Sequence, residues 1–187
     1  VASGGWLPLA QEQLAIRGHA VEARIYAEDS DKGFLPSTGR LIHLAPPAES
    51  LNVRVDTGVE QGDEITPHYD PMIAKLIVWD DSEGNPRERA LARMQQALAD
   101  YHIAGVTSNI GFLSRLVACP AFAGADLDTG LIERERGFIF PADGEPPHEA
   151  WLVAALAELL RDREHGRRDA TVSRDPHSPW HLRDGWR

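Results

Sequence analysis

A histidine and an aspartate two residues apart, His68 and Asp70, could form a metal or acid–base site. On a β-strand, side chains at positions i and i+2 lie on the same face, so the imidazole and the carboxylate would point in one direction. Asp70 directly precedes Pro71, however, and an aspartate in that position is typical of a turn. We therefore favour a structural role in a turn over a catalytic pair.

The single cysteine, Cys119, could be a nucleophile if its thiol were deprotonated. It precedes Pro120 with no histidine nearby in the sequence, and a cysteine in this setting is usually a small buried apolar residue. One cysteine also excludes an intrachain disulfide framework and any zinc site with several thiolates. This cysteine content is typical of a reducing compartment.

Arg54 is a third candidate because it lies between Val53 and Val55. If this segment is a strand, Arg54 lies on the face opposite the two valines, where its neighbours restrict the guanidinium. A guanidinium held in this way can stabilise a developing oxyanion. The alternative is a structural ion pair with a residue such as Asp56 or Glu60, and composition alone favours the ion pair.

Several common catalytic motifs are absent from the sequence. It contains no glycine-rich phosphate loop, no G-x-S-x-G elbow, no H-E-x-x-H and no C-x-x-C, so a self-sufficient enzyme is not expected.

The formal net charge of −10 argues against a nucleic-acid partner. No apolar run approaches the roughly 20 residues that span a bilayer, so we expect a soluble protein without a membrane partner.

Short strands are expected to position the candidate residues. Residues 19–27 alternate apolar and polar side chains, which predicts a strand with one buried face. Further strands are predicted at 40–44, 52–56 and 72–79, and residues 29–39 have the composition of a loop. The strand at 72–79 is the most apolar, so we expect it at the centre of the sheet, buried on both faces.

Helical patterns follow the strands. A helix is predicted to begin after the N-cap Asn85 and to end near residue 100, with Arg89, Arg93 and Gln96 on its solvated face. A second helix is predicted from a cap at Thr107 or Ser108 to a stop before Pro120. Strands followed by helices indicate an α+β fold with a mostly antiparallel sheet and packed helices.

The composition divides the chain into four parts. We expect a connecting segment at 1–17, a folded domain at 18–136, a linker at 137–147, and a helix with a poorly ordered tail at 148–187. The helix is predicted over 148–163. Its apolar side is formed by Trp151, Leu152, Ala155, Leu156, Leu159 and Leu160. Because the chain lacks an initiator Met and ends in a polar-aromatic stretch, we expect a fragment of a longer protein.

Several sequence blocks occur in an order and spacing that indicate one family. They are RGHAVEARIYAED at 17–29, FLPSTGR at 34–40, VRVDTG at 53–58, YDPMIAKLI at 69–77, GVTSNI at 105–110, and the segment 122–133. Together they strongly resemble the C-terminal domain of biotin carboxylase over about residues 5–135. The end of the chain, 175–187, resembles the segment after the carboxylase domain in 3-methylcrotonyl-CoA carboxylase alpha subunits, where a domain that docks onto the other subunit begins. Acetyl-, propionyl- and other acyl-CoA carboxylases are the alternatives.

The resemblance implies ATP- and bicarbonate-dependent carboxylation of carrier-bound biotin, here for 3-methylcrotonyl-CoA carboxylation in leucine breakdown. In the family, an ATP-grasp lobe binds ATP and magnesium or manganese, and its catalytic motif lies upstream of the stretch matched by Leu7–Glu12. We therefore assign no metal ligand to this chain and expect it to be inactive alone. The implied partners are the ATP-grasp lobe and biotin carrier domain of the same protein, a carboxyltransferase beta subunit, and a second copy in a homodimer. The implied location is the cytoplasm, or the mitochondrial matrix in a eukaryote.

Arg54 matches the family arginine that lies beside the biotin ureido group and bicarbonate. The resemblance implies that its guanidinium stabilises the negative charge on the ureido oxygen when the adjacent nitrogen is deprotonated. The preference between ion pair and functional cation is thereby reversed, and Arg54 becomes the candidate catalytic and biotin-binding residue. A non-catalytic interaction module with the same fold is the alternative from another functional class.

Overall fold

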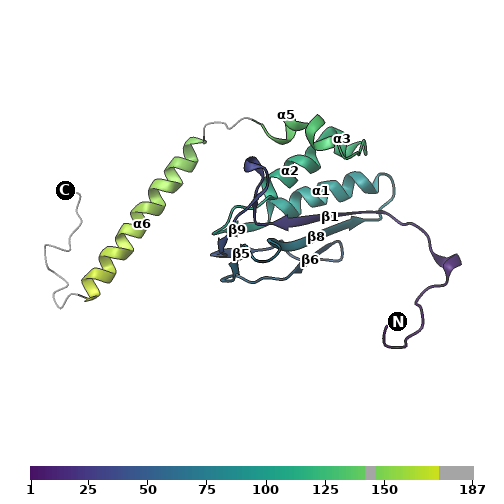
Figure 1. The fold of residues 1–187 in the computed structure, drawn as a ribbon, viewed down its shortest axis with the longest axis horizontal. Coiled ribbons are helices and arrows are strands. Elements are labelled where there is room, and N and C mark those ends of the chain that lie inside the picture. The colour runs from purple at the N-terminus through teal and green to yellow at the C-terminus, as the bar shows by residue number, and fades with distance from the viewer. Residues whose placement is uncertain (142–145, 173–187) are drawn as a thin grey trace. The chain divides into compact units, whose positions relative to one another are not determined.

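The most apolar strand of the chain, β8 (Met72–Asp80), is the central strand of a three-stranded antiparallel sheet. It pairs with β1 (His19–Tyr26) on one side and β6 (Val53–Thr57) on the other (Figure 1). The computed structural model describes residues 1–141 and 146–172, and side chains only as far as 163 in the last helix. The chain divides into two units, Val1–Pro141 and Ala142–Arg187, and the sheet belongs to the first.

Three two-stranded sheets accompany the main sheet. They are β2 (Glu28–Asp29) with β3 (Leu35–Pro36), β4 (Gly39–Arg40) with β7 (Glu64–Ile65), and β5 (His43–Ala45) with β9 (His102–Ala104). The segment 29–39, predicted as a loop, thus contains short strand pairings and the 3₁₀ turn η2 (Ser30–Lys32). The strand predicted at 40–44 is split, because Arg40 pairs with β7 and His43 and Leu44 pair with β9.

Helices cover one face of the main sheet. α1 (Pro86–Ala99) packs against β8 and β1, and α2 (Ile110–Ala118) packs against α1 (Figure 1). The short helices α3 (Pro120–Ala123), α4 (Leu131–Arg134) and α5 (Arg136–Ile139) complete this layer. Asn85 caps α1 by accepting a hydrogen bond from the backbone N–H of Glu88, as predicted. The α+β class, the antiparallel sheet and the packed helices are therefore confirmed.

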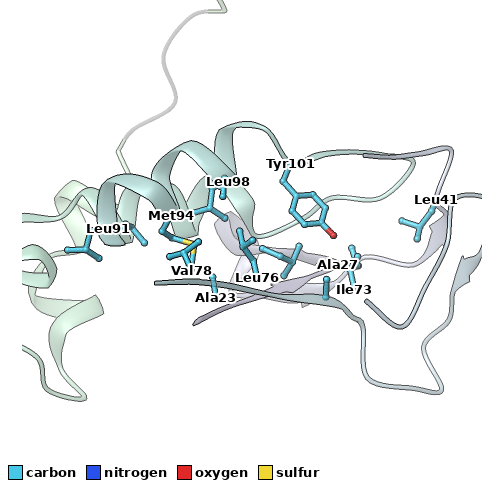
Figure 2. Close-up of a cluster of buried hydrophobic side chains, with 14 of the residues drawn as sticks. Ala23, Ala27, Leu41, Ile73, Leu76, Val78, Leu91, Met94, Leu98 and Tyr101 are labelled. Carbon is cyan, nitrogen blue, oxygen red and sulfur yellow. The ribbon is translucent and has the colours of Figure 1, made fainter. Parts of the chain in front are cut away.

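The core lies between α1 and the sheet. Figure 2 shows Leu91, Met94 and Leu98 of α1 above Leu76 and Val78 of β8, with all five side chains buried. Hydrophobic burial of this kind is the main favourable term in folding. The alternation predicted for β1 matches this arrangement, because Ala23 and Ile25 face the helix while Glu22 and Arg24 are exposed.

The prediction that β8 is buried on both faces is wrong. Leu76 and Val78 are fully buried beneath α1, but on the opposite face Lys75 and Ile77 are only half-buried and Trp79 is 37% exposed. Composition misled the prediction, because Ile77 and Trp79 make the strand apolar although they lie on the sheet's outer face. The outer face of the sheet is therefore accessible in the described unit.

The start of α2 differs from the prediction. Its N-cap position is Asn109 and not Thr107 or Ser108, and the Asn109 side chain does not cap the helix. The Asn109 amide instead accepts from Tyr26 N at 2.9 Å and donates to Arg24 O at 3.1 Å. Asn109 therefore attaches the beginning of α2 to the end of β1.

The second unit contains one long helix, α6 (His148–Val172). The predicted start at 148 is confirmed, and the helix continues past its expected end at 163 as far as Val172. Residue 137, the expected start of the linker, lies within α5, where Ile139 is fully buried. The tail segment 175–187 lies outside the described residues.

Candidate functional site

Arg54 lies in the middle of β6, where the pairing with β8 determines its direction. Val53 and Val55 face the core partly buried, so Arg54 projects from the opposite face, as the alternation predicts. Its side chain is 70% exposed. Because the edge strand β6 is hydrogen-bonded to the central strand β8, the Cα and Cβ atoms of Arg54 are held in place. The guanidinium remains accessible to a ligand.

Asp56 contacts the Arg54 guanidinium. The Nε of Arg54 donates to Oδ1 of Asp56 at 2.8 Å, in the ion pair that composition alone favours. This hydrogen bond, with the negative charges of Asp56 and Glu49, raises the pKa of Arg54 above its ordinary value. The ion pair occupies only one of the three guanidinium nitrogens, because only Nε takes part in it. Within residues 1–141 and the described part of α6, both terminal nitrogens are without a hydrogen-bond partner.

Charged side chains surround Arg54 on the outer face of the sheet. In the strand register Arg54 is opposite Ile77, and Asp56 is opposite Lys75. The face displays Glu22 and Arg24 from β1, Lys75, Ile77 and Trp79 from β8, and Arg54 and Asp56 from β6. These charges sum to one net positive charge, three cations less two anions, within a chain of net charge −10. Arg54 therefore lies on a face with charges of both signs, and two of the three cations are paired there with the two carboxylates.

The other two candidates have structural roles. Asp70 accepts a hydrogen bond from Met72 N at 3.1 Å, which places it in a turn at the start of β8, and the turn prediction is confirmed. His68 is exposed in the loop before it and does not lie on a strand. Cys119 is fully buried at the C-cap of α2, so the prediction of a buried apolar residue is also confirmed.

Sequence analysis missed an aspartate–arginine cluster at the other end of β8. Asp80 is 3% exposed and accepts from Ser82 N at 2.9 Å and Ser82 Oγ at 2.6 Å. It also accepts from Arg93 Nη2 at 3.0 Å and Arg89 Nε at 3.1 Å. The Ser82 hydrogen bonds and the two guanidinium groups hold the pKa of Asp80 well below its ordinary range.

This cluster corrects the assignment of Arg89 and Arg93 to a solvated helix face. Both point from α1 to the end of β8, and Arg89 also donates to the Ser82 and Glu83 carbonyl oxygens. Two arginines four residues apart on a helix, after a strand ending in aspartate, were the available signal. The cluster joins helix to strand, and both oxygens of Asp80 are engaged within it, so we treat it as structural.

The described residues contain no arrangement of three or more His, Cys, Asp or Glu side chains that could hold a metal ion. None of the helices in the described ranges combines the length and apolar composition needed to cross a membrane. Among these residues Arg54 is the candidate that best fits a ligand. It offers unpaired N–H donors suited to a carbonyl or anionic oxygen.

A sequence model of the family described as "Biotin carboxylase C-terminal domain" matches residues 22–134, which include the whole three-stranded sheet apart from the first residues of β1. The chain belongs to the biotin carboxylase C-terminal domain family.

Its relatives among characterised proteins include carboxylase subunits. The chain is 44% identical over its whole length to the mitochondrial methylcrotonoyl-CoA carboxylase subunit alpha of Dictyostelium discoideum, of which it covers 26%. Over 86% of its length it is 46% identical to the corresponding subunit of Arabidopsis thaliana, covering 23% of that protein. It is 38% identical over 97% of its length to the mitochondrial propionyl-CoA carboxylase alpha chain of Caenorhabditis elegans, covering 25%. The chain thus spans about a quarter of each of these relatives.

Solved structures agree with this family. The biotin carboxylase domain dimer of Hydrogenobacter thermophilus 2-oxoglutarate carboxylase, in complex with MgADP, ADP and bicarbonate, matches with a TM-score of 0.68 and 36% identity. That match covers 76% of this chain and 30% of the other. The biotin carboxylase subunit of a pyruvate carboxylase also gives 0.68, at 34% identity and the same coverage.

Proposed function

We propose that the chain is the C-terminal part of the biotin carboxylase component of an acyl-CoA carboxylase, and that Arg54 is its biotin-binding and catalytic cation. The supporting observation is the position of Arg54 on the accessible sheet face, inside the matched family region, with two terminal nitrogens available. Biotin supplies the ureido nitrogen that is carboxylated. Arg54 donates hydrogen bonds to the ureido oxygen and stabilises the negative charge that develops there.

The remaining parts of the reaction are assigned outside this chain. ATP, magnesium or manganese, and the base that acts on bicarbonate belong to an ATP-grasp lobe, which we propose precedes residues 1–17 in the full-length protein. We propose that residues 148–187 begin a domain that docks onto a carboxyltransferase beta subunit. The apolar side of α6 is exposed, with Trp151 63% and Leu152 70% exposed. This exposure supports a helix that packs against another part of the full-length protein or another subunit. The chain alone is expected to show no bicarbonate-dependent ATP hydrolysis.

The test of this function is Arg54→Gln in the full-length subunit. Removal of an oxyanion donor typically lowers turnover by about 100- to 1,000-fold, so carboxylation of free biotin should fall by that factor while ATP binding is retained. Arg24→Gln is the matched control, because it removes an exposed arginine from the same face two strands away. Unchanged biotin carboxylation in the Arg54 variant would contradict the proposal.

For the acyl-CoA we propose 3-methylcrotonyl-CoA, and therefore a role in leucine breakdown. The identities of 44% and 46% to methylcrotonoyl-CoA carboxylase subunits support this choice over propionyl-CoA, where the identity is 38%. The full complex should carboxylate 3-methylcrotonyl-CoA with a higher kcat/KM than propionyl-CoA or acetyl-CoA. The reverse order would assign the chain to another acyl-CoA carboxylase.

The alternative function is an interaction module that has lost its chemistry. It predicts a parent gene with neither an ATP-grasp lobe upstream nor a biotin attachment site downstream. Sequencing the flanking reading frame distinguishes the two functions.

For the location we propose the cytoplasm, or the mitochondrial matrix in a eukaryote. The relatives from eukaryotes that support the second location are named as mitochondrial proteins.

A further inference from the structure

We propose that Asp56 is the positioning residue of Arg54: its carboxylate fixes the guanidinium through Nε and directs the two terminal nitrogens toward the ligand. This inference rests on the proposed function of Arg54. Asp56 itself does not contact the ligand, and its effect on the reaction is exerted through Arg54.

The contact uses Nε of the guanidinium and leaves both terminal nitrogens outside the ion pair. Asp56 and Arg54 lie two residues apart on β6 and project from the same face, and the Nε–Oδ1 distance is 2.8 Å. A carboxylate that bound both terminal nitrogens would occupy the fork that binds oxygen acceptors. Binding at Nε instead restricts rotation of the guanidinium and leaves the Nη atoms available.

The strand register gives Asp56 a competing cation, and the observed pairing is with Arg54. Lys75 of β8 is directly opposite Asp56. Of the ion pairs formed by the residues that the structure describes, the one made by Asp56 is to Arg54, and none involves Lys75. Asp56 is therefore ion-paired with Arg54 and not with Lys75.

A second carboxylate acts on Arg54 only at longer range. Glu49 accepts a hydrogen bond from Val55 N at 3.0 Å, so its side chain is committed to the edge of β6. Its negative charge adds to that of Asp56 at Arg54, but Asp56 makes the direct hydrogen bond. Orientation of the guanidinium thus depends on Asp56.

The ion pair has little to contribute to folding. The side chains of Arg54 and Asp56 are 70% and 42% exposed, and exposed pairs add little to stability. The same face contains a matched pair for comparison, Glu22 and Arg24 on β1, whose Nε–Oε1 distance is 3.5 Å. Variants at Asp56 and Glu22 should therefore both fold, and differ only in their effect on the reaction.

The test measures biotin-dependent turnover of the full-length subunit with free biotin as the substrate. Asp56→Ala should lower kcat/KM for biotin about tenfold, because a misdirected donor loses part of its effect on the transition state. Asp56→Asn, which keeps an oxygen at the position of Oδ1, should recover most of that loss. Glu22→Ala should stay within about twofold of the wild type, and KM for ATP should not change in any variant.

A double-mutant cycle separates positioning from a structural effect. In an Arg54→Gln background, Asp56→Ala should cause no further loss, because the group that it orients is gone. Equal losses in both backgrounds, or no loss in the single variant, would overturn the role of Asp56 while leaving that of Arg54 intact. No loss in Arg54→Gln itself would overturn the proposed function instead. If Asp56→Ala unfolds the subunit, Asp56→Ser replaces it in the same cycle, with the same expected outcomes.

Discussion

Aspartate meets arginine at two places on neighbouring strands, and the two sites differ in what surrounds them. At the end of β8, Asp80 is 3% exposed and its oxygens are occupied by Ser82, Arg89 and Arg93. On β6, the Asp56 and Arg54 side chains are exposed, and one nitrogen of the guanidinium is engaged. The same residue types thus form a closed cluster in one place and an open one in the other.

Burial explains the difference in function. A buried carboxylate must have its acceptor sites filled, because an unpaired buried charge is strongly destabilising. Once the carboxylate is satisfied in this way, both of its oxygens are occupied, and the contribution of the cluster is to join α1 to β8. An exposed pair is free of that requirement and stabilises the fold little, so its arginine can retain donors for another molecule.

The largest effect expected on the closed cluster is the loss of stability in Asp80→Ala. This change leaves Arg89 and Arg93 beside a partly buried space with their main acceptor gone, so the urea midpoint of the 187-residue chain should fall markedly. Asp56→Ala, the same substitution at the open site, should leave the midpoint nearly unchanged. Similar midpoints for the two variants would show that burial does not separate the sites.

A smaller effect is expected from the acid dependence of the same cluster. The pKa of Asp80 is lowered in the folded chain, so its stabilising effect is present above the ordinary aspartate pKa of about 3.9 and is lost as the pH falls toward the lower folded value. The difference in unfolding free energy between wild type and Asp80→Asn should therefore be full at pH 7 and shrink below about pH 4. A difference that stays constant down to pH 2 would contradict the assigned protonation behaviour.

The sequence was sufficient to predict the features that depend on local pattern. The alternation of β1, the Asn85 cap of α1 and the side of β6 on which Arg54 lies follow from neighbouring residues, and the structure has all three. The Arg54–Asp56 contact was also within reach, because residues i and i+2 share a strand face.

The features that sequence analysis missed depend on long-range contacts. Asp80 meets Arg93 only because α1 folds back over β8, and Asn109 binds the end of β1 across 83 residues of sequence. The burial of the outer face of β8 was wrongly predicted for a related reason. Apolar composition alone does not reveal whether another layer of the fold covers Ile77 and Trp79. Residue type therefore predicts the strand, and tertiary contacts determine its environment.

The smallest expected effect concerns a buried polar group with no partner. Tyr101 is 3% exposed, its hydroxyl has no hydrogen-bond partner in the described residues, and burial raises its pKa. Figure 2 shows the Tyr101 ring in the core cluster, with its hydroxyl on the side of Ala27 and Ile73.

Tyr101→Phe removes this unpaired hydroxyl and keeps the ring. Because the hydroxyl loses water on folding and gains no hydrogen bond, its removal should leave the free energy of unfolding unchanged or raise it by up to about 1 kcal/mol. Urea denaturation of the 187-residue chain measures the difference. Tyr26→Phe is the control, since a hydrogen bond links Tyr26 to Arg24, and it should be the less favourable substitution. A clear loss of stability in Tyr101→Phe would reveal an acceptor for its hydroxyl, and Tyr101 would then belong with Asp80 among the satisfied buried groups.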